Sequence, residues 1–198
     1  MAQLDISDIF HAAETLKPVV RHTQLIAAPR INTKSQIYLK TENLQFTGSF
    51  KLRGAYYKIS QLSEEEKSKG VIACSAGNHA QGIALSATTL GIKSVIVMPA
   101  GAPLSKVEAT KNYGAEVVLV PGVYDDAARE ATRLAEEKGY VFAHPFNDEY
   151  VIAGQGTIGL EILNEMDDVD AVIVPIGGGG LIAGIAFAIK SLRPNVKV

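Results

Sequence analysis

Short β-branched runs alternate along the chain with stretches of helical character, and this alternation limits the possible folds more than any other feature. Each run is four to six residues long and mostly apolar, as expected for strands that are buried on both faces of a sheet. The runs lie at 37–41, 71–74, 94–98, 116–120, 140–143 and 171–176. The helical stretches between them lie at 50–62, 78–90, 104–113, 125–138, 154–166 and 181–192. Strands and helices in this alternation predict an α/β fold built on a parallel sheet.

Local residue choices agree with several of the predicted helices. Gly91, Gly114 and Gly139 stand where helices of this kind end on a glycine. The helix predicted over 125–138 opens with two aspartates, which suit a helix N-terminus, and it carries an apolar stripe on one face. By contrast, the charged run 64–69 indicates a solvated surface turn without a function.

Composition and charge exclude several classes of protein. The chain has 198 residues, 47% of them hydrophobic and 20% charged, so it can bury a core and is neither disordered nor a coiled coil. The formal net charge of −2 gives no field that would hold nucleic acid as a main partner. Cys74 is the only cysteine, so an intramolecular disulfide is impossible and a reducing, cytoplasmic location is expected.

One uncharged stretch, 171–189, is nominally long enough to span a bilayer. Pro175 and the four glycines 177–180 interrupt it, and the unsatisfied backbone of such a break is costly in lipid. We therefore expect no membrane partner. The stretch is predicted to form a buried strand over 171–176, a glycine turn and a buried helix.

A lysine opens the helix predicted over 50–62, within the sequence TGSFKLRG at 47–54. Helix N-termini disfavour cations, and an apolar neighbour such as Phe50 lowers the pKa of an ammonium group. Both effects favour the neutral amine of Lys51, which is the form that attacks a carbonyl or a Schiff base. The alternative is an ordinary surface lysine on a first helical turn.

The sequence SAGNHAQG at 75–82 directly follows a predicted strand. A strand that runs through small residues into a helix presents free backbone N–H groups, which suit a carboxylate or a phosphate. Ser75 and Asn78 could add side-chain hydrogen bonds, or one of them could simply cap the helix. His79 could transfer protons, but a single histidine is more often structural.

Four consecutive glycines, Gly177 to Gly180, follow the last predicted strand and precede Leu181. Such a run allows successive N–H groups to point into one concavity at a helix N-terminus, where a phosphate binds without any side chain. The spacing matches neither the dinucleotide-binding pattern G-x-G-x-x-G nor a Walker A loop. A bare turn is disfavoured by the entropic cost of four glycines, so phosphate binding is the preferred interpretation.

Together these clusters resemble the fold-type II pyridoxal-phosphate enzymes, most closely the branch of threonine ammonia-lyase (threonine dehydratase) and serine racemase. The shared sequences occur in the same order and with similar spacing, and the likeness runs through essentially the whole chain. They are GSFKLRGA, SAGNHAQG, AGQGTIGLEI and VPIGGGGLIAGIA. The resemblance implies the three-layer, parallel-sheet fold of tryptophan synthase β-like enzymes. It also implies pyridoxal 5'-phosphate as cofactor, an amino acid as substrate, and a homo-oligomer.

The resemblance also implies a role for individual residues. Lys51 is similar to the lysine that binds the cofactor covalently, Phe50 to the residue beside the cofactor ring, and Asn78 to the partner of the ring's phenolic oxygen. The turn that would hold the substrate is Ser75, Ala76, Gly77 and His79. The backbone groups that would surround the phosphate belong to Gly177, Gly178, Gly179, Gly180 and Leu181.

The implied reaction is the dehydration and deamination of L-threonine, and of L-serine, to a 2-oxo acid and ammonia, with isoleucine biosynthesis as its metabolic setting. Serine racemases of this family carry a serine at position 76 that moves protons on the second face of the substrate. Ala76 cannot do this, which favours elimination over racemisation. The O-acetylserine sulfhydrylase branch fits less well, because its phosphate loop usually carries threonines among the glycines.

The same resemblance implies two domains, and a catalytic unit longer than this chain. Residues 1–69 and 148–198 would form a large, phosphate-binding domain that is incomplete here, and 70–147 a smaller mobile one. The part that supplies the group facing the pyridine nitrogen would lie outside the sequence. The alternative function is therefore a catalytically silent fragment that binds a phosphate-bearing ligand or assembles with a complementary chain.

Overall fold

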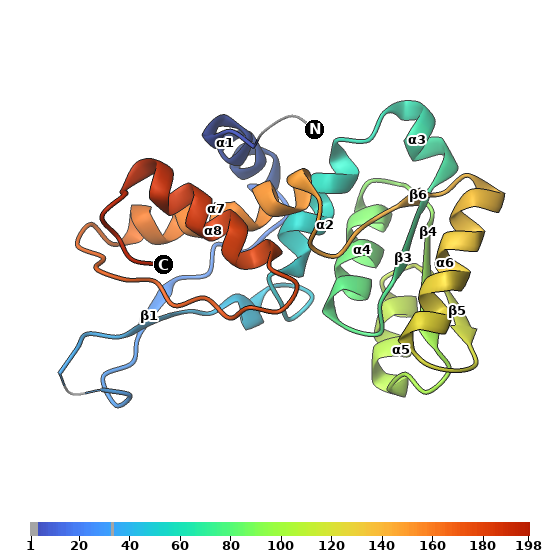
Figure 1. Ribbon diagram of the computed structural model, residues 1–198, viewed down its shortest axis with the longest axis horizontal. Coiled ribbons are helices and arrows are strands. Elements are labelled where there is room, and N and C mark those ends of the chain that lie inside the picture. Colours follow the sequence, from blue (N-terminus) through green and yellow to red (C-terminus); the bar gives the residue numbers. More distant parts are fainter. Residues whose placement is uncertain (1–3, 33) are drawn as a thin grey trace.

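The computed structural model describes residues 4–32 and 34–198. Its elements form two groups that meet where helix α2 (Lys51–Ser60) packs against helix α4 (Asn78–Thr89) (Figure 1). One group is built on a parallel sheet, and the other consists of packed helices with a small β-hairpin. The α/β fold with a parallel sheet that the sequence predicts is confirmed.

The parallel sheet has four strands in the order β5-β4-β3-β6. All of them come from predicted runs, and neighbouring strands in the sheet are parallel. Their bounds are β3 (Val71–Cys74), β4 (Ser94–Pro99), β5 (Glu116–Val120) and β6 (Val141–Phe142). Every residue of β3 is buried, as its continuous apolar sequence predicts for a central strand covered on both faces.

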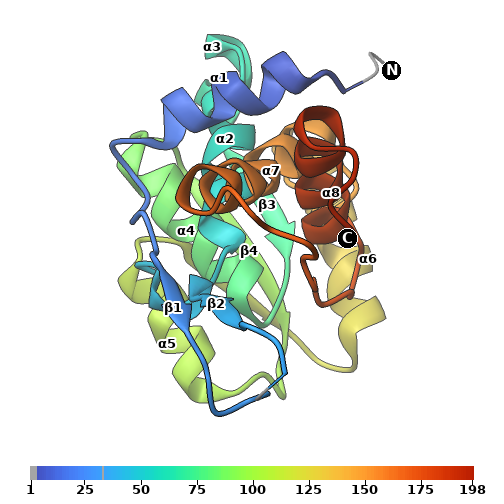
Figure 2. The same ribbon diagram turned by 90° about the vertical axis from the view of Figure 1, so that its left-hand side faces the viewer.

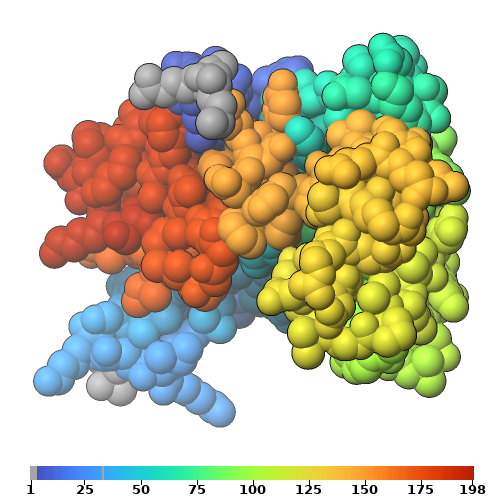
Figure 3. Space-filling view, turned by 45° about the vertical axis from the view of Figure 1, so that its right-hand side comes forward, coloured from blue at the N-terminus to red at the C-terminus, as the bar shows by residue number. Residues whose placement is uncertain are grey.

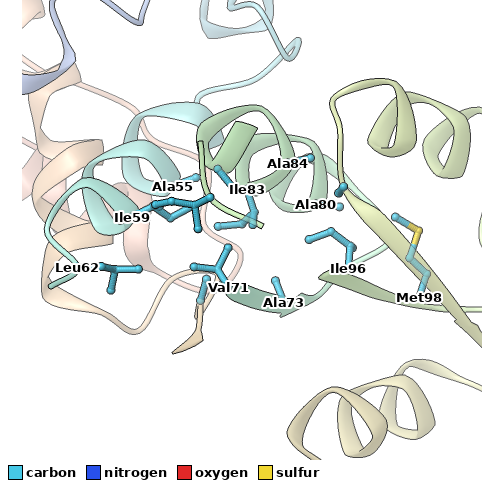
Figure 4. Close-up of a cluster of buried hydrophobic side chains, with 14 of the residues drawn as sticks. Ala55, Ile59, Leu62, Val71, Ala73, Ala80, Ile83, Ala84, Ile96 and Met98 are labelled. Atoms are coloured by element: carbon cyan, nitrogen blue, oxygen red, sulfur yellow. The ribbon is translucent and has the colours of Figure 1, made fainter. Parts of the chain in front are cut away.

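Helices cover both faces of this sheet, and alternate residues of β3 contact different helices. Val71 and Ala73 belong to a buried cluster with α4 and with α5 (Leu104–Asn112), shown in Figure 4. Ile72 and Cys74 pack instead against the alanines of α6 (Tyr124–Lys138), on the other side of the sheet (Figure 1). The apolar stripe that the sequence predicts for α6 is confirmed, with Ala131 completely buried.

The second group consists of α1 (Ile6–Leu16), α2, α7 (Glu149–Glu165) and α8 (Gly180–Leu192). Helix α7 packs against the other three, and glycines line its contacts with α2 and α8. A hairpin of β1 (Leu25–Ala27) and β2 (Tyr38–Lys40) lies below these helices in Figure 2, followed by the 3₁₀ turn η1 (Glu42–Leu44). None of the helices in the described part of the chain combines the length and the apolar character needed to cross a bilayer.

The prediction of a buried strand over 171–176 is wrong for this structure. The segment makes a single bridge, between Ala171 and Lys197, and Ile173 and Ile176 are 96% and 70% exposed. A continuous apolar run becomes a regular strand only when strands lie beside it, and the described residues place none there beyond this bridge. The run is therefore extended and exposed, although its composition is that of a buried strand.

Several other elements differ from the sequence analysis. The run 37–41, predicted as a buried strand of the parallel sheet, forms β2 of the antiparallel hairpin and is exposed or half-buried, because among the described residues it pairs only with β1 and lies outside the covered sheet. The charged run 64–69 is a short helix, α3 (Glu64–Lys69), because Ser63 and Glu66 form a capping box at its start. The analysis assigned no element to α1, which begins at a capping box of Asp5 with Asp8. Helix α7 begins at Glu149 rather than at 154, because the Asp148 side chain accepts a hydrogen bond from the N–H of Val151.

Candidate active site

A cavity of about 280 Å³ lies between three segments that are distant in sequence. They are the start of α2, the segment between β6 and α7, and the glycine run before α8. In Figure 3 the orange segment that begins α7 lies between the red C-terminal segment and the yellow α6. The lining residues are Phe50, Lys51, Pro145, Phe146, Gln155 and the run from Pro175 to Leu181.

Lys51 is the first residue of α2, and its side chain reaches into this cavity. Burial lowers the pKa of its ammonium group, which is the direction that the sequence predicted. The Nζ atom donates a hydrogen bond to the carbonyl oxygen of Pro145 at 2.7 Å and lies 5.5 Å from the centre of the Phe50 ring. The amine is thus held inside the cavity and shifted toward its neutral, nucleophilic form.

The glycine run also lines the cavity and leads into α8. Gly179 is the N-cap of this helix and has a φ of 91°, in the left-handed region that glycine adopts without strain. Because the first N–H groups of a helix have no partner within it, the start of α8 offers donors for an anion. The anion nest that the sequence suggested stays a prediction, and the left-handed Gly179 at the start of α8 is compatible with it.

Gly178 requires a different explanation from Gly179, because its φ does not lie in the left-handed region. A Cβ atom at Gly178 would lie 2.2 Å from the Cδ1 atom of Phe146, so a larger side chain would require the ring of that residue to move. Phe146 in turn contacts His144 edge to face, with ring centres 4.7 Å apart. Steric closeness to the Phe146 ring, rather than backbone strain, favours glycine at this position.

Pro145, Phe146 and Gln155 line the cavity, although the sequence analysis singled out none of them. The first two follow β6, whose carboxyl end meets the same edge of the sheet as that of β3. Loops at the carboxyl edge of a parallel sheet are where ligands bind, so the position of the sequence HPF directly after a predicted strand is a signal that could have found them.

The SAGNHAQG turn follows β3 and continues into the first residues of α4, and none of its residues lines the cavity. Asn78 is exposed, and its Oδ1 atom accepts a hydrogen bond from Lys106 at 3.4 Å. Ser75, Ala76 and Gly77 are partly buried, and the Ser75 hydroxyl accepts a hydrogen bond from the N–H of Gly77. The structure thus brings Phe50 and Lys51 together with the glycine run, and it places the turn beside this group.

His79 differs from the rest of this turn because it is 4% exposed. Its Nε2 atom lies 3.0 Å from the carbonyl oxygen of Ala143, a contact that requires a proton on Nε2. Burial lowers the pKa of His79 to about 4, so the imidazole is neutral at physiological pH. This is the environment of a structural histidine that fixes the segment after β6 to α4.

A buried ion-pair network holds the start of α2, and the sequence analysis missed it. Arg53 is completely buried and bonds to carboxylate oxygens of Glu42 and Glu161, at 2.6–2.9 Å. It also donates to the hydroxyl of Thr157 at 3.2 Å. Because Arg53 lies two positions after Lys51, the network fixes the turn of α2 that carries the amine.

Three side chains near this network, His22, Glu161 and Glu165, offer ligand atoms within 4.8 Å of one another. The ammonium group of Lys40 already lies 2.8 Å from Glu161 and 2.7 Å from Glu165. The positive charge that these carboxylates need is therefore supplied by the protein, and we assign no metal to this cluster.

The cavity fits pyridoxal phosphate by its chemistry. It combines an amine for the aldehyde carbon, an aromatic ring beside that amine, and a glycine run with helix N–H groups for the phosphate. Lys51, Phe50 and the residues from Gly177 to Leu181 are the groups that would hold it.

Two curated relatives match nearly the whole chain. The L-threonine ammonia-lyase of Thermotoga maritima is 56% identical over 197 residues, which are 98% of this chain and 49% of that protein. A catabolic L-threonine dehydratase of Staphylococcus aureus is 52% identical over 198 residues and is covered to 57%. The chain thus spans about half the length of the curated relatives it matches.

Two solved structures have the same fold as this chain. Maize serine racemase superposes with a TM-score of 0.95 at 40% identity, over 98% of this chain and 60% of that one. Isoform 2 of threonine deaminase from Solanum lycopersicum superposes with a TM-score of 0.91 at 42% identity, over 98% and 55%. These comparisons confirm the resemblance drawn from the motifs. Since the sequence model of that family also matches residues 16–198, the chain belongs to the pyridoxal-phosphate dependent enzymes.

Proposed function

We propose that this chain acts in the pyridoxal-phosphate-dependent dehydration and deamination of L-threonine to 2-oxobutanoate and ammonia, and of L-serine to pyruvate and ammonia. The observation that carries the proposal is the position of the Lys51 amine, which faces a glycine run and a helix N-terminus across one cavity. The names of the two curated relatives support the choice of threonine.

The cofactor, when bound, withdraws electrons from the amino acid joined to it, which makes its Cα–H acidic and allows the β-hydroxyl to leave. The chain supplies positioning and proton transfer. The amine of Lys51, with its lowered pKa, would hold the cofactor and then take the Cα proton. The N–H groups from Gly177 to Leu181 would bind the phosphate, and the Phe50 ring would pack beside the pyridine ring.

We assign the SAGNHAQG turn to the substrate side of the site. The backbone and hydroxyl donors of Ser75, Gly77 and His79 would bind the substrate carboxylate, and Asn78 the phenolic oxygen. Since this turn lies beside the cavity, the assignment requires it to move toward Lys51 on binding. The domain division proposed from the sequence allows this, because 70–147 carries the turn, while 1–69 and 148–198 carry the amine and the glycine run.

The alternative is a catalytically silent chain that binds a phosphate-bearing ligand or assembles with a complementary chain. Its support is the exposed apolar run 171–176, in which Ile173 is almost fully exposed, together with the partial coverage of the relatives. Assembly as a homo-oligomer and a cytoplasmic location are further parts of the proposal. The absence of a second cysteine beside Cys74 supports a reducing compartment.

Product analysis tests the proposal. The purified protein is incubated with pyridoxal phosphate and L-threonine, and 2-oxobutanoate and ammonia are measured together. Equal amounts of the two products are expected from the wild type. The activity of Lys51→Ala is expected to be lower by about 10²–10⁴-fold or more, with an unchanged circular dichroism spectrum. Lys58→Ala is the matched control, because Lys58 lies on the same helix and pairs with Asp148 outside the cavity.

Two results would overturn the proposal. Cofactor binding without any 2-oxo acid from threonine or serine would favour the silent alternative. A tenth or more of the wild-type activity in Lys51→Ala, without an added amine, would show that Lys51 is not the base.

A further inference from the structure

Gln155 lies in the wall of the Lys51 cavity and is only 1% exposed. It belongs to helix α7, within the sequence AGQGTIGLEI, whose residues have no role in the proposed function. Among the residues that line the cavity in the described part of the chain, only Lys51 and Gln155 have polar side chains. Gln155 therefore requires an explanation, because a buried amide normally has partners for both of its polar atoms.

Two glycines bring Gln155 this close to the start of α2. A Cβ atom at Gly154 would lie 2.7 Å from the Cα atom of Gly54, so α7 and α2 cross with their backbones nearly touching. A Cβ atom at Gly54 would lie 2.4 Å from the Nε2 atom of Gln155. The amide group of Gln155 thus occupies the space beside the first turn of α2.

One hydrogen bond fixes the orientation of the amide. The N–H of Gly54 donates to the Oε1 atom of Gln155 at 3.3 Å, and only the oxygen of an amide can accept this bond. The Nε2 atom is consequently the free end, and it donates no hydrogen bond to any residue within 4–32 and 34–198. Although the residue is only 1% exposed, this donor has no acceptor among the described residues and is available to a ligand in the cavity that Gln155 lines.

We propose that Gln155 is a further cofactor-binding residue, whose Nε2 donates to the phosphate group of pyridoxal phosphate. The inference rests on the proposed function only in that the cavity around Lys51 holds this cofactor. Once the amine of Lys51 is joined to the cofactor, Gln155 is the remaining side-chain donor in the lining. A neutral donor beside the N–H groups of the glycine run increases the hydrogen bonds to a doubly charged anion.

The test uses Gln155→Glu, which keeps an acceptor for the Gly54 N–H and replaces the donor by a negative charge. Protein freed of cofactor is titrated with pyridoxal phosphate and, separately, with pyridoxal, which has the same aldehyde but no phosphate. Affinity for pyridoxal phosphate is expected to fall by about 10- to 100-fold. Affinity for pyridoxal is expected to change by less than about threefold, because the contact is made to the phosphate.

Gln61→Glu is the matched control, since Gln61 is a half-buried glutamine at the C-terminal end of α2 and does not line the cavity. It introduces the same charge and is expected to leave the ratio of the two affinities unchanged. Should Gln155→Glu fail to fold, Gln155→Met removes the donor without adding a charge. A smaller loss of affinity is then expected, for pyridoxal phosphate and not for pyridoxal.

Equal losses for pyridoxal phosphate and pyridoxal, or no loss for either, would overturn the inference. The ratio of the affinities for pyridoxal phosphate and pyridoxal is also measured in the Lys51→Ala variant, where binding is noncovalent. The loss of phosphate-dependent affinity caused by Gln155→Glu is expected to persist there. A protein that binds the cofactor but makes no 2-oxo acid would overturn the proposed function, but it would not contradict the role of Gln155 in binding the phosphate. A fully active Gln155→Glu with unchanged cofactor affinity would overturn the role of Gln155 alone.

Discussion

The Nζ atom of Lys51 donates a 2.7 Å hydrogen bond to the carbonyl oxygen of Pro145, 94 residues further along the chain. This bond joins the first turn of α2 to the segment that leads from β6 into α7. A carbonyl oxygen can accept a hydrogen bond from an ammonium group or, more weakly, from a neutral amine, so the contact holds the nitrogen in place without requiring its charge. The reactive amine is therefore positioned before any ligand arrives, which reduces the entropic cost of its reaction.

Substitutions in the glycine run are expected to weaken cofactor binding for two different reasons. Gly179→Val places a β-branched residue at a φ of 91°, which costs at least about 1–2 kcal/mol. Gly178→Val has no such strain but would displace the Phe146 ring from the cavity. Titration with pyridoxal phosphate is expected to show at least about tenfold weaker binding for both, and a smaller effect on binding of the amino acid to the loaded enzyme.

Gly101→Ala is the control for this pair. Gly101 is exposed, a Cβ atom there would meet nothing within 4 Å, and its φ is not in the left-handed region. Unchanged affinity for pyridoxal phosphate in both valine variants would contradict the assignment of this run to the phosphate.

Stability is expected to depend on pH through His79. Its pKa is lowered from 6.5 to about 4 in the folded protein, so between these values the unfolded chain binds the proton and the folded protein does not. Stability therefore falls as the pH decreases from 6.5 to 4, by about 3 kcal/mol from this residue. His79→Gln can still donate to the Ala143 carbonyl but does not titrate. Equilibrium unfolding in urea is expected to show a flatter pH dependence for the variant, and parallel curves would contradict the assignment.

The charge network beneath Lys51 is expected to be essential for stability. Arg53→Met leaves the carboxylates of Glu42 and Glu161 without their buried partner, and breaking such a pair typically costs about 3–5 kcal/mol. Arg133→Met also removes an arginine with two carboxylate partners, but on the exposed face of α6, where little effect is expected. Urea unfolding of the two variants gives the comparison, and a similar loss in both would show that burial of Arg53 does not matter.

The type of reaction is expected to follow from Ala76. Racemisation needs a proton donor on the face of the substrate opposite the lysine, and a methyl group cannot supply one. The enzyme is therefore expected to convert L-serine to pyruvate with little D-serine. Ala76→Ser is expected to raise racemisation relative to elimination, by at most the 10²–10⁴-fold that a positioned acid or base typically provides. Chiral chromatography gives the ratio, and substantial D-serine from the wild type would contradict this reading.

Residue patterns along the chain were sufficient to predict the parallel sheet and most helices, because continuous apolar runs and the helical stretches between them are visible in the local sequence. The runs that became β3, β4 and β5 lie at or within one residue of their predicted bounds. The run 171–176 has the same composition but no neighbouring strands, and pairing is a property of the whole sheet rather than of one segment. Helix α1 depends on a capping box and on packing against α7, which the alternation of apolar runs does not show.

The residues of the candidate site can likewise be divided into those that the local sequence predicts and those that it does not. Lys51 and the glycine run were predictable because a lysine at a helix start and four glycines after a strand are unusual locally. Phe146 also carried a local signal, because it closely follows a predicted strand, whereas Gln155 and Arg53 were not predictable because their importance comes from contacts across the chain. The bond of Arg53 to Glu161, for example, joins residues 108 positions apart.

The central claim is that Lys51 binds the cofactor covalently, and reductive trapping tests it most directly. The protein loaded with pyridoxal phosphate is treated with borohydride, digested and mapped by mass spectrometry. The account predicts loss of the visible absorbance band and one modified peptide, with the pyridoxyl group on Lys51. Modification of another lysine, such as Lys58 or Lys106, or no stable adduct at all, would contradict it.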